Sequence, residues 1–346
     1  TLERLASHPG ASERYIVVLA MEVREGVDGL VKVRSLARAF PSAFYAFTSS
    51  THTLGAAECP GKASNATAGG RELTRLCAGL RIAPSNVVVT VLDADSLISD
   101  RYVLRLDGLI CEARSRGDEA SVTCRIFAPY MTFCNADEET IPWMVRLVDA
   151  AWSFFLLYQL ARPLQVRMPV ACYSMSLALL ERIGYWEVGE CGIGEDAHTA
   201  LKAFWATGGE ARTRRRQSTR PPSPASRRTS SSLPQAGTTP IFERFECQTV
   251  CYDGAASVSP RRAWFEGVKL RYVQAKRHAL GHVDTGYCMW KLATTRAVPW
   301  YKRLLIVLQS SEVLMLLASA MIMLALSLAR AVAVGGSRGG GRARPR

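Results

Sequence analysis

The first hundred residues alternate between short apolar runs and segments with helical spacing. Residues 14–26, 42–50 and 87–92 are rich in β-branched and aromatic side chains, which is typical of strands. Between them, residues 29–40 and 69–80 repeat apolar side chains at helical intervals. Strand, helix, strand, helix, strand in this order predicts an α/β domain on a parallel sheet, whose ligands bind at the carboxyl ends of the strands.

The second half of the chain has longer helical patterns. Residues 143–163 are strongly apolar, but Arg146 and Asp149 interrupt them and the longest clean run is about twelve residues. That length is short for a membrane span, so the pattern predicts a buried or interfacial helix. Residues 269–290 resume helical spacing and predict a further helix.

A different pattern appears near the C-terminal end. Residues 313–329 carry no charge, and after Arg330 the chain continues with Ala-Val-Ala-Val. Together they form an apolar segment near 22 residues long, enough to cross the roughly 30 Å hydrocarbon core of a bilayer. We therefore predict a transmembrane segment over residues 304–334, with a buried helix as the alternative.

The formal net charge of +13 is concentrated in two segments. Residues 211–240 hold seven arginines and the last sixteen residues hold four, with no acid in either segment, so the rest of the chain is close to neutral. This distribution argues against a nucleic-acid-binding face, which needs basic residues on structured elements. We predict one folded domain in two parts, 1–210 and 241–300, separated by a disordered Arg/Ser/Pro insertion at 211–240 and followed by a basic tail at 335–346.

The strand at 87–92 runs directly into Asp93-Ala94-Asp95. Because side chains alternate along an extended chain, Asp93 and Asp95 point to the same side and repel each other unless a cation lies between them. Mg²⁺ and Mn²⁺ bind carboxylate oxygens together with phosphate oxygens. Asp is also common in ordinary turns, so the pair predicts a metal site only in combination with other signals.

Three further groups of residues carry candidate chemistry. Glu195 and Asp196 stand at a predicted helix start, where acids also complement the helix dipole. Gln274 and Arg277 are three apart on one helix face. The segment Gly-Lys-Ala-Ser-Asn at 61–65 places a lysine and an amide in a predicted loop. Each has an ordinary alternative, namely a helix cap, a solvated surface or a plain loop.

Taken in order, Asp-x-Asp, Glu-Asp and Gln-x-x-Arg, with an α/β domain before them and a membrane span after them, resemble membrane-associated glycosyltransferase family 2. This branch contains the cellulose, chitin and hyaluronan synthases. The resemblance covers about residues 14–330, apart from the insertion at 211–240. It implies a GT-A fold, a UDP-linked nucleotide-sugar donor, a carbohydrate or lipid acceptor, and Mg²⁺ or Mn²⁺.

The resemblance also implies roles for residues near the donor. Asp93 and Asp95 match the positions that bind the nucleotide-sugar and the metal, with Asp95 as the direct metal ligand. Glu22 occupies the place of an acid that faces the nucleoside. Lys62 and Asn65 match the loop that approaches the nucleotide.

Around the acceptor, the resemblance implies that Asp196 is the general base and that Glu195 lies beside it. Gln274 and Arg277 match two fixed positions near the diphosphate and the acceptor. The family has a tryptophan where this chain has His278, and histidine offers less area for stacking a sugar ring. Two alternatives therefore stay open: a non-catalytic membrane scaffold with a GT-A-like domain, and a synthase of lipid-linked sugars.

Topology and compartment follow from cysteine usage and one glycosylation motif. The ten cysteines form no C-x-x-C pair and no dense framework, which favours a reduced, cytosol-facing domain. Asn65-Ala66-Thr67 is a glycosylation sequon within the predicted nucleotide loop, where a glycan would obstruct a ligand. We expect an integral protein of the Golgi or plasma membrane, with the catalytic domain in the cytosol and Asn65 unmodified.

Overall fold

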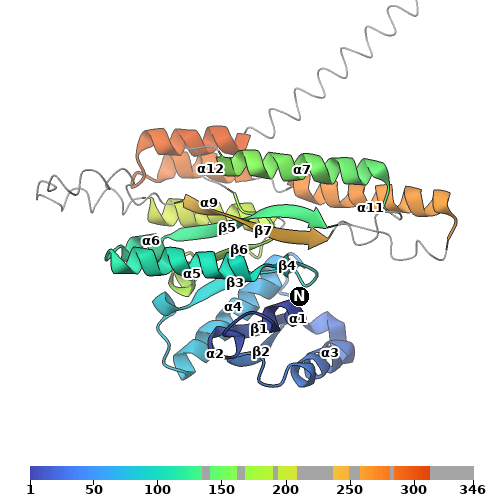
Figure 1. The fold of residues 1–346 in the computed structure, drawn as a ribbon. Helices are drawn as coiled ribbons and strands as arrows, with labels where there is room; N and C mark the ends of the chain where they lie inside the picture. The colour runs from blue at the N-terminus through green and yellow to red at the C-terminus, as the bar shows by residue number, and fades with distance from the viewer. Residues whose placement is uncertain are drawn as a thin grey trace, which may run out of the picture.

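The protein has a mixed α/β fold in which a curled sheet is flanked by helices (Figure 1). The structure, a computed structural model, describes residues 1–134, 141–161, 168–189, 194–208, 237–248, 258–280 and 284–311.

The N-terminal part is built on two parallel strands, as the sequence predicts. Strand β1 (Ile16–Glu22) pairs along its whole length with β2 (Ala46–His52), and α3 (Gly26–Ala39) connects them. Helix α4 (Lys62–Gly79) packs against both strands. The short elements of this part are α1 (Leu2–Ala6), α2 (Ala11–Arg14) and the 3-10 turns η1 (Val23–Glu25) and η2 (Pro84–Asn86).

The main sheet has five strands in the order β3-β6-β5-β7-β4. Only β5 and β7 run parallel, while the other neighbours are antiparallel. The strands are β3 (Val88–Val91), β4 (Leu97–Ile98), β5 (Arg125–Cys134), β6 (Tyr173–Ser176) and β7 (Gly237–Gln248).

The prediction that β3 continues one parallel sheet with β1 and β2 is wrong. Strand β3 pairs antiparallel with β6, and β1 and β2 form a sheet of their own. Tertiary packing explains the difference, because Val91 on β3 is buried in one cluster with Tyr173 and Met175 of β6. The pairing of a short apolar strand is decided by partners far along the chain.

Helices cover both faces of the main sheet. Helices α5 (Asp100–Ser115) and α6 (Glu119–Thr123) lie against one face, and α7 (Trp143–Ala161) and α9 (Glu195–Thr207) lie against the other (Figure 1). Helix α8 (Leu177–Arg182) follows directly after β6.

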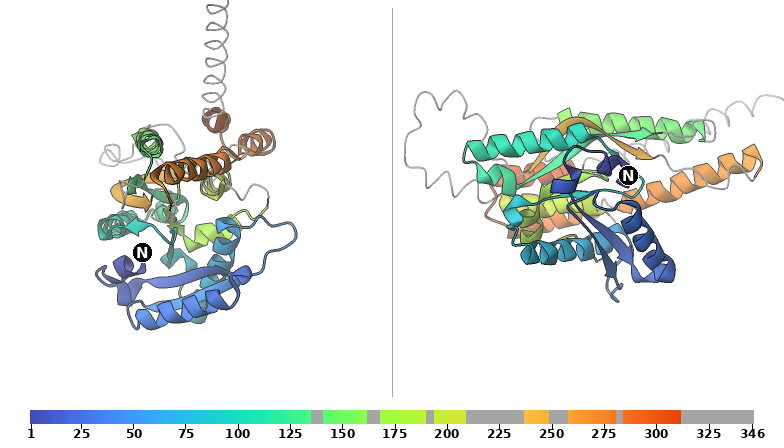
Figure 2. Two further views of the ribbon diagram at one scale, coloured as in Figure 1. Left: turned by 90° about the vertical axis from the view of Figure 1, so that its right-hand side faces the viewer. Right: turned by 60° about the horizontal axis from the view of Figure 1, so that its bottom comes forward.

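An outer layer of helices lies on the side of the main sheet away from β1 and β2 (Figures 1 and 2). We define this outer helical layer as α7, α11 (Pro260–Leu280), α12 (Asp284–Thr294) and the helical residues 300–311. It is joined to α9 by a cluster in which Trp205 packs with Cys288 and Ile306. The helix predicted at 143–163 is therefore confirmed, and the one predicted at 269–290 corresponds to parts of α11 and α12.

The loop predicted at residues 61–65 is wrong, because α4 already begins at Lys62. Its first turns lack apolar periodicity and contain Gly69 and Gly70, which resemble a helix boundary. In the structure these glycines permit close packing. A Cβ on Gly70 would lie 3.0 Å from the Trp186 ring, and one on Gly69 would contact Ala20 of β1.

The insertion predicted at 211–240 is too long by four residues. Strand β7 begins at Gly237, and residues 237–240 pair in parallel with residues 125–128. The rest of the insertion lies outside the described residues, as do the apolar segment 313–329 and the tail at 335–346. Within the ranges that the structure describes, no helix combines the length and the apolarity that a membrane span requires.

Candidate functional site

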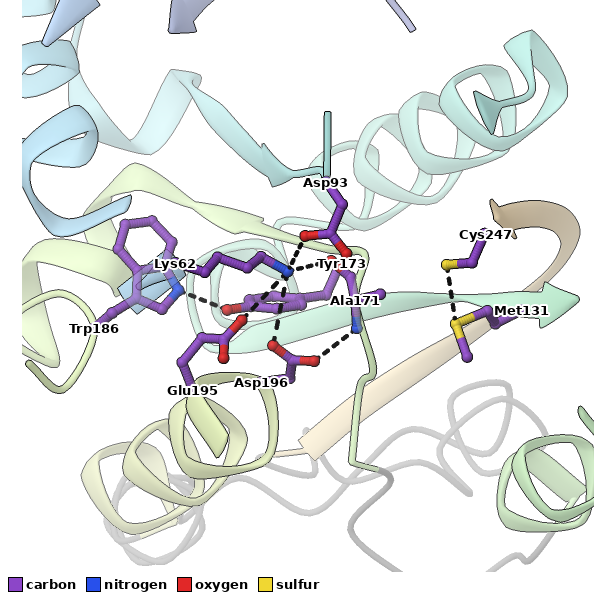
Figure 3. A network of polar contacts seen from close by, with 9 residues as sticks. All are labelled: Lys62, Asp93, Met131, Ala171, Tyr173, Trp186, Glu195, Asp196 and Cys247. Atoms are coloured by element: carbon purple, nitrogen blue, oxygen red, sulfur yellow. Dashed lines mark hydrogen bonds and ion pairs between the residues drawn. The ribbon is translucent and has the colours of Figure 1, made fainter. Parts of the chain in front are cut away.

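Four charged side chains from three distant segments meet beside the main sheet. The ammonium of Lys62 lies 2.8 Å from Asp93 Oδ1, 3.3 Å from Glu195 Oε1 and 3.9 Å from Asp196 Oδ1. Figure 3 shows Lys62 reaching between the three acids. We call these four residues the Lys62 centre. They contribute one positive charge and up to three negative charges, so the centre is acidic overall.

Local structure explains how each member is placed. Lys62 is the first residue of α4, directly after Gly61, whose φ of 146° suits glycine. Asp93 opens the turn between β3 and β4, and its carbonyl accepts a hydrogen bond from the Ser96 amide. Glu195 and Asp196 form the first turn of α9, where the helix dipole stabilises negative charge. The predicted placement of this pair at a helix start is confirmed.

Ala171 connects two members of the centre through its backbone. Lys62 Nζ donates to the Ala171 carbonyl at 2.8 Å, and the Ala171 amide donates to Asp196 Oδ2 at 2.7 Å. Ala171 has a φ of 59°, in the left-handed region that non-glycine residues seldom adopt. Such conformations persist only where the surrounding structure holds them, and they cluster at functional sites. Nothing in the local sequence indicates this role.

The protonation states in the centre are strongly perturbed. Burial alone would lower the pKa of Lys62, but the charges of Asp196, Glu195 and Asp93 outweigh it and raise that pKa well above its usual value. Burial, reinforced by the neighbouring Asp196, raises the pKa of Glu195 to about 9. At neutral pH Lys62 is therefore charged and Glu195 holds a proton. A strongly raised pKa of a buried acid is a common feature of acid–base sites.

Aromatic side chains form one wall of the centre. Tyr173 is fully buried on β6, and its hydroxyl accepts a hydrogen bond of 2.5 Å from Trp186 Nε1 (Figure 3). Burial raises the pKa of Tyr173 well above its usual value, with Asp196 and Glu195 adding to the shift, so the phenol stays neutral. A neutral, apolar wall strengthens the electrostatic interactions of the charges beside it.

The two aspartates after β3 differ in their surroundings. Asp93 faces Lys62, whereas Asp95 is exposed and makes no ion pair with Lys62. Both lie near Cys247 of β7. Burial raises the pKa of this thiol to about 12, and the charges of Asp93 and Asp95 add to the shift. Asp95 thus stands at the solvent side of the site, beside the carboxylate that reaches inward.

The centre is suited to a hard cation in its chemistry, although its ligand set is not preassembled. Carboxylate oxygens are the ligands that Mg²⁺ and Mn²⁺ prefer, and the centre has more carboxylates than cations. Across the described ranges, however, no three acidic, histidine or cysteine side chains are already arranged as a metal-binding group. The role of Asp93 and Asp95 as metal ligands stays a prediction, in which water and a ligand's phosphate oxygens would fill the remaining coordination positions.

Asn65 lies one helical turn after Lys62 on α4. Its side-chain oxygen is buried and accepts no hydrogen bond from the part of the chain that the structure describes. A buried amide oxygen without a donor is uncommon, since most buried polar groups find partners. This oxygen is free to accept a further hydrogen bond, and the predicted contact of Asn65 with a nucleotide stays a prediction.

Glu22 lies apart from the Lys62 centre in its interactions. It is the last residue of β1, its side chain is buried, and it forms an ion pair with Arg24 at 2.9 Å. Together with Glu25 it also forms a capping box for the 3-10 turn η1. These contacts give Glu22 a local structural role, and the predicted contact with a nucleoside stays a prediction.

The Gln-x-x-Arg residues lie on α11 in the outer helical layer. Gln274 accepts a hydrogen bond from Arg271, which forms a buried ion pair with Asp149 of α7. The described contact of Gln274 thus lies within α11 and does not reach the Lys62 centre. Arg277 and His278 fall within α11, but their side chains lie outside what the structure describes.

Helix α9 is also fixed from its far side. His198 is buried one turn after Glu195, and its Nδ1 lies 2.5 Å from Asp284 Oδ1 of α12. The same imidazole packs against Tyr287 at a ring separation of 4.7 Å. This contact holds the helix that presents Asp196 against the outer helical layer, and the sequence contains no motif that predicts it.

Comparisons with known proteins identify no relative. No protein-family model matches the chain, and no curated protein matches it either. The resemblance to glycosyltransferases therefore depends on the order of the short motifs, and the geometry of the Lys62 centre is the physical basis on which a function can be argued.

Proposed function

We propose that the chain is an inverting, metal-dependent glycosyltransferase with a GT-A type domain, anchored in a membrane with this domain facing the cytosol. It would transfer a sugar from a nucleotide-sugar, most simply a UDP-sugar, to a hydroxyl group of a carbohydrate or lipid acceptor. The observation that carries the proposal is the meeting of Lys62, Asp93 and the Glu195–Asp196 pair from three separate segments.

In this proposal the donor's diphosphate lies at the Lys62 centre. Asp93 and Asp95 would hold Mg²⁺ or Mn²⁺, which stabilises the negative charge that develops on the leaving diphosphate. Lys62 would donate to the same phosphate oxygens, and the buried oxygen of Asn65 would accept from the donor. Arg277 is the further candidate for a bidentate contact to the diphosphate.

Asp196 is the proposed general base. The Ala171 amide holds one of its oxygens at 2.7 Å and fixes the orientation of the carboxylate. Asp196 would take the proton of the acceptor hydroxyl while that oxygen attacks the anomeric carbon and the bond to the diphosphate breaks. A single displacement of this kind inverts the anomeric centre. Glu195, protonated beside it, keeps a second negative charge away from the base.

The proposal is tested with Asp196→Asn. Asparagine keeps an oxygen for the Ala171 amide but cannot accept the acceptor proton, so we expect turnover to fall by roughly 10²- to 10⁴-fold. Binding of UDP-sugars with Mn²⁺, measured by calorimetry, should stay near the wild-type value. Asp107→Asn is the matched control. Asp107 lies on α5, away from the centre, and forms an ion pair with Arg14 of α2.

Two results would contradict the proposal in different ways. Near-normal turnover by Asp196→Asn would show that another group is the base. If the wild-type protein neither binds nor hydrolyses any of a panel of UDP- and GDP-sugars in the presence of Mn²⁺, the domain is a scaffold. Analysis of the product as a polymer or as a single-sugar lipid would separate a polysaccharide synthase from a synthase of lipid-linked sugars.

A further inference from the structure

Helix α7 has the reverse of the polarity expected for a helix at a water-exposed surface. Phe154 is 73% exposed and Leu147 is 63% exposed, whereas Asp149 is 2% exposed. The buried carboxylate pairs with Arg271 of α11. A helix on a soluble domain normally buries its apolar side chains and exposes its charges. The outward face of α7 is therefore built to contact an apolar environment.

The rest of the outer helical layer shares this property. Of the 27 large hydrophobic side chains that are exposed in the described ranges, eighteen belong to these four helices. Figures 1 and 2 show that the helices lie together on one side of the molecule. The set includes seven aromatic side chains that are each more than half exposed: Trp143, Phe154, Tyr158, Phe265, Tyr272, Trp290 and Trp300. Clustered apolar surface of this kind marks an interaction site.

The charges of the layer are strongly unequal. Its three described acids are Asp149, Glu266 and Asp284, of which Asp149 and Asp284 are buried in ion pairs. Basic side chains such as Arg146 and Lys276 are exposed on α7 and α11. An apolar and aromatic surface fringed by basic groups is complementary to anionic lipid headgroups above acyl chains.

The course of the chain favours a bilayer over a protein as the occupant of this surface. The described structure ends at residue 311 within this layer, two residues before the uncharged stretch 313–329. The composition and length of that stretch predict a membrane span, which would place the layer that leads into it at the headgroup level. Tryptophan and tyrosine are enriched at that level. Lysine, by contrast, is depleted at protein–protein interfaces.

We infer that the outer helical layer lies in the surface of an anionic lipid bilayer, with its exposed aromatic side chains at the boundary between headgroups and acyl chains. The apolar segment 313–329 alone would leave the domain free to tumble on a tether. The layer instead fixes its orientation, with β1 and β2 directed away from the membrane (Figure 1). This inference concerns orientation and does not depend on sugar transfer.

The test places an environment-sensitive NBD dye at one site on the layer and one site far from it. Phe154→Cys labels α7, and Val27→Cys labels α3, where Val27 is 74% exposed and so matches Phe154. The full chain, with the exposed Cys111 changed to serine, is reconstituted in nanodiscs of phosphatidylcholine and phosphatidylserine. The labelled Cys111→Ser parent supplies the background from the other cysteines.

We expect the dye at position 154 to shift to the blue and to be quenched several-fold more by brominated lipids than the dye at position 27. Equal, weak quenching at both positions would overturn the inference, because the domain would then only be tethered. A blue shift at position 154 without quenching by brominated lipids would also overturn it and would assign the layer to a protein partner or a second copy of the chain. No sugar donor is present, so these outcomes are independent of the proposed enzymatic activity.

Discussion

The structure contains two charge clusters that differ in charge balance and in solvent exposure. In the outer helical layer, Asp149 and Arg271 form a one-to-one pair in which both residues are below 9% exposed. In the Lys62 centre, one ammonium faces three acidic side chains, and the side chain of Asp93 is still 38% exposed. The first cluster is balanced and closed, and the second is unbalanced and open on one side.

This difference separates a structural role from a functional one. A balanced buried pair gains no stability from a further ligand. Removing one of its two partners leaves the other charge buried and uncompensated. An acidic cluster with an open side is relieved by any cation that reaches it, so its state depends on ligands and on pH. Experiments that perturb both clusters in the same protein test this distinction directly.

The largest expected effect is on folding stability at the balanced pair. Asp149→Ala leaves the guanidinium of Arg271 buried without its acid, which costs about 3–5 kcal/mol in the free energy of unfolding. Thermal or denaturant unfolding followed by circular dichroism measures the loss. The double variant Asp149→Leu, Arg271→Met should recover most of it, because a hydrophobic pair can replace a buried ion pair. A loss below about 1 kcal/mol in the single variant would mean that the pair is not structural.

The next effect is ligand-dependent stabilisation at the unbalanced centre. If Mn²⁺ binds the centre, a concentration 100-fold above its dissociation constant should stabilise the wild-type protein by about 2.7 kcal/mol. Asp93→Asn should abolish most of this thermal shift. The control Asp28→Asn, at an exposed position of α3, should retain it. An equal shift in the Asp93 variant would place the cation elsewhere.

The third expected effect, which is the smallest when counted per pH unit, concerns the proton on Glu195. Its pKa is raised to about 9 in the folded protein, from about 4.5 when exposed. Between these values the folded state holds a proton that the unfolded state has released, so the stability of the protein falls as pH rises through this window. Glu195→Gln removes this pH dependence, so the stability of the variant relative to the wild type should increase as the pH rises. We expect a relative gain in stability on the order of 1 kcal/mol for each pH unit within this window, since one pKa unit corresponds to about 1.4 kcal/mol.

The measurement compares the melting temperatures of the two proteins at about pH 5 and about pH 8 without added metal. Glu112→Gln, at an exposed position of α5, serves as the control and should show no such change. If the difference between Glu195→Gln and wild type is the same at both pH values, Glu195 does not hold its proton in the folded state.

The elements that were predicted correctly have strong local signals. Strand β1 is a short apolar run, β2 contains the strand-favouring residues Phe47, Thr48 and Thr51, and α7 is apolar over most of its length. The start of α4 was missed because its first turns contain small and polar residues instead of periodic apolar ones. Two glycines there allow close packing against neighbouring elements. The antiparallel pairing of β3 was missed because its partner β6 lies more than eighty residues away, and only tertiary burial selects it.

The site was predictable as a set of residue types, and its connections were not. Asp93, Glu195, Asp196 and Lys62 were all identified from short motifs, and the structure brings them together. The ion pairs that join Lys62 to three acids depend on how α4, β3 and α9 are packed. The contact between His198 and Asp284 joins helices that are far apart in sequence and carries no local signature.

Ala171 positions charged side chains of the site through its backbone alone, although its own side chain is only a methyl group. Its carbonyl and its amide bind opposite charges of the site, and both directions are fixed by a backbone rotation that a β-branched residue would resist. Glycine would tolerate that rotation without strain, but it would also loosen the grip on both partners. A mutational survey restricted to acids, bases and nucleophiles would pass over position 171, although the relative placement of the Asp196 carboxylate and the Lys62 ammonium is decided there.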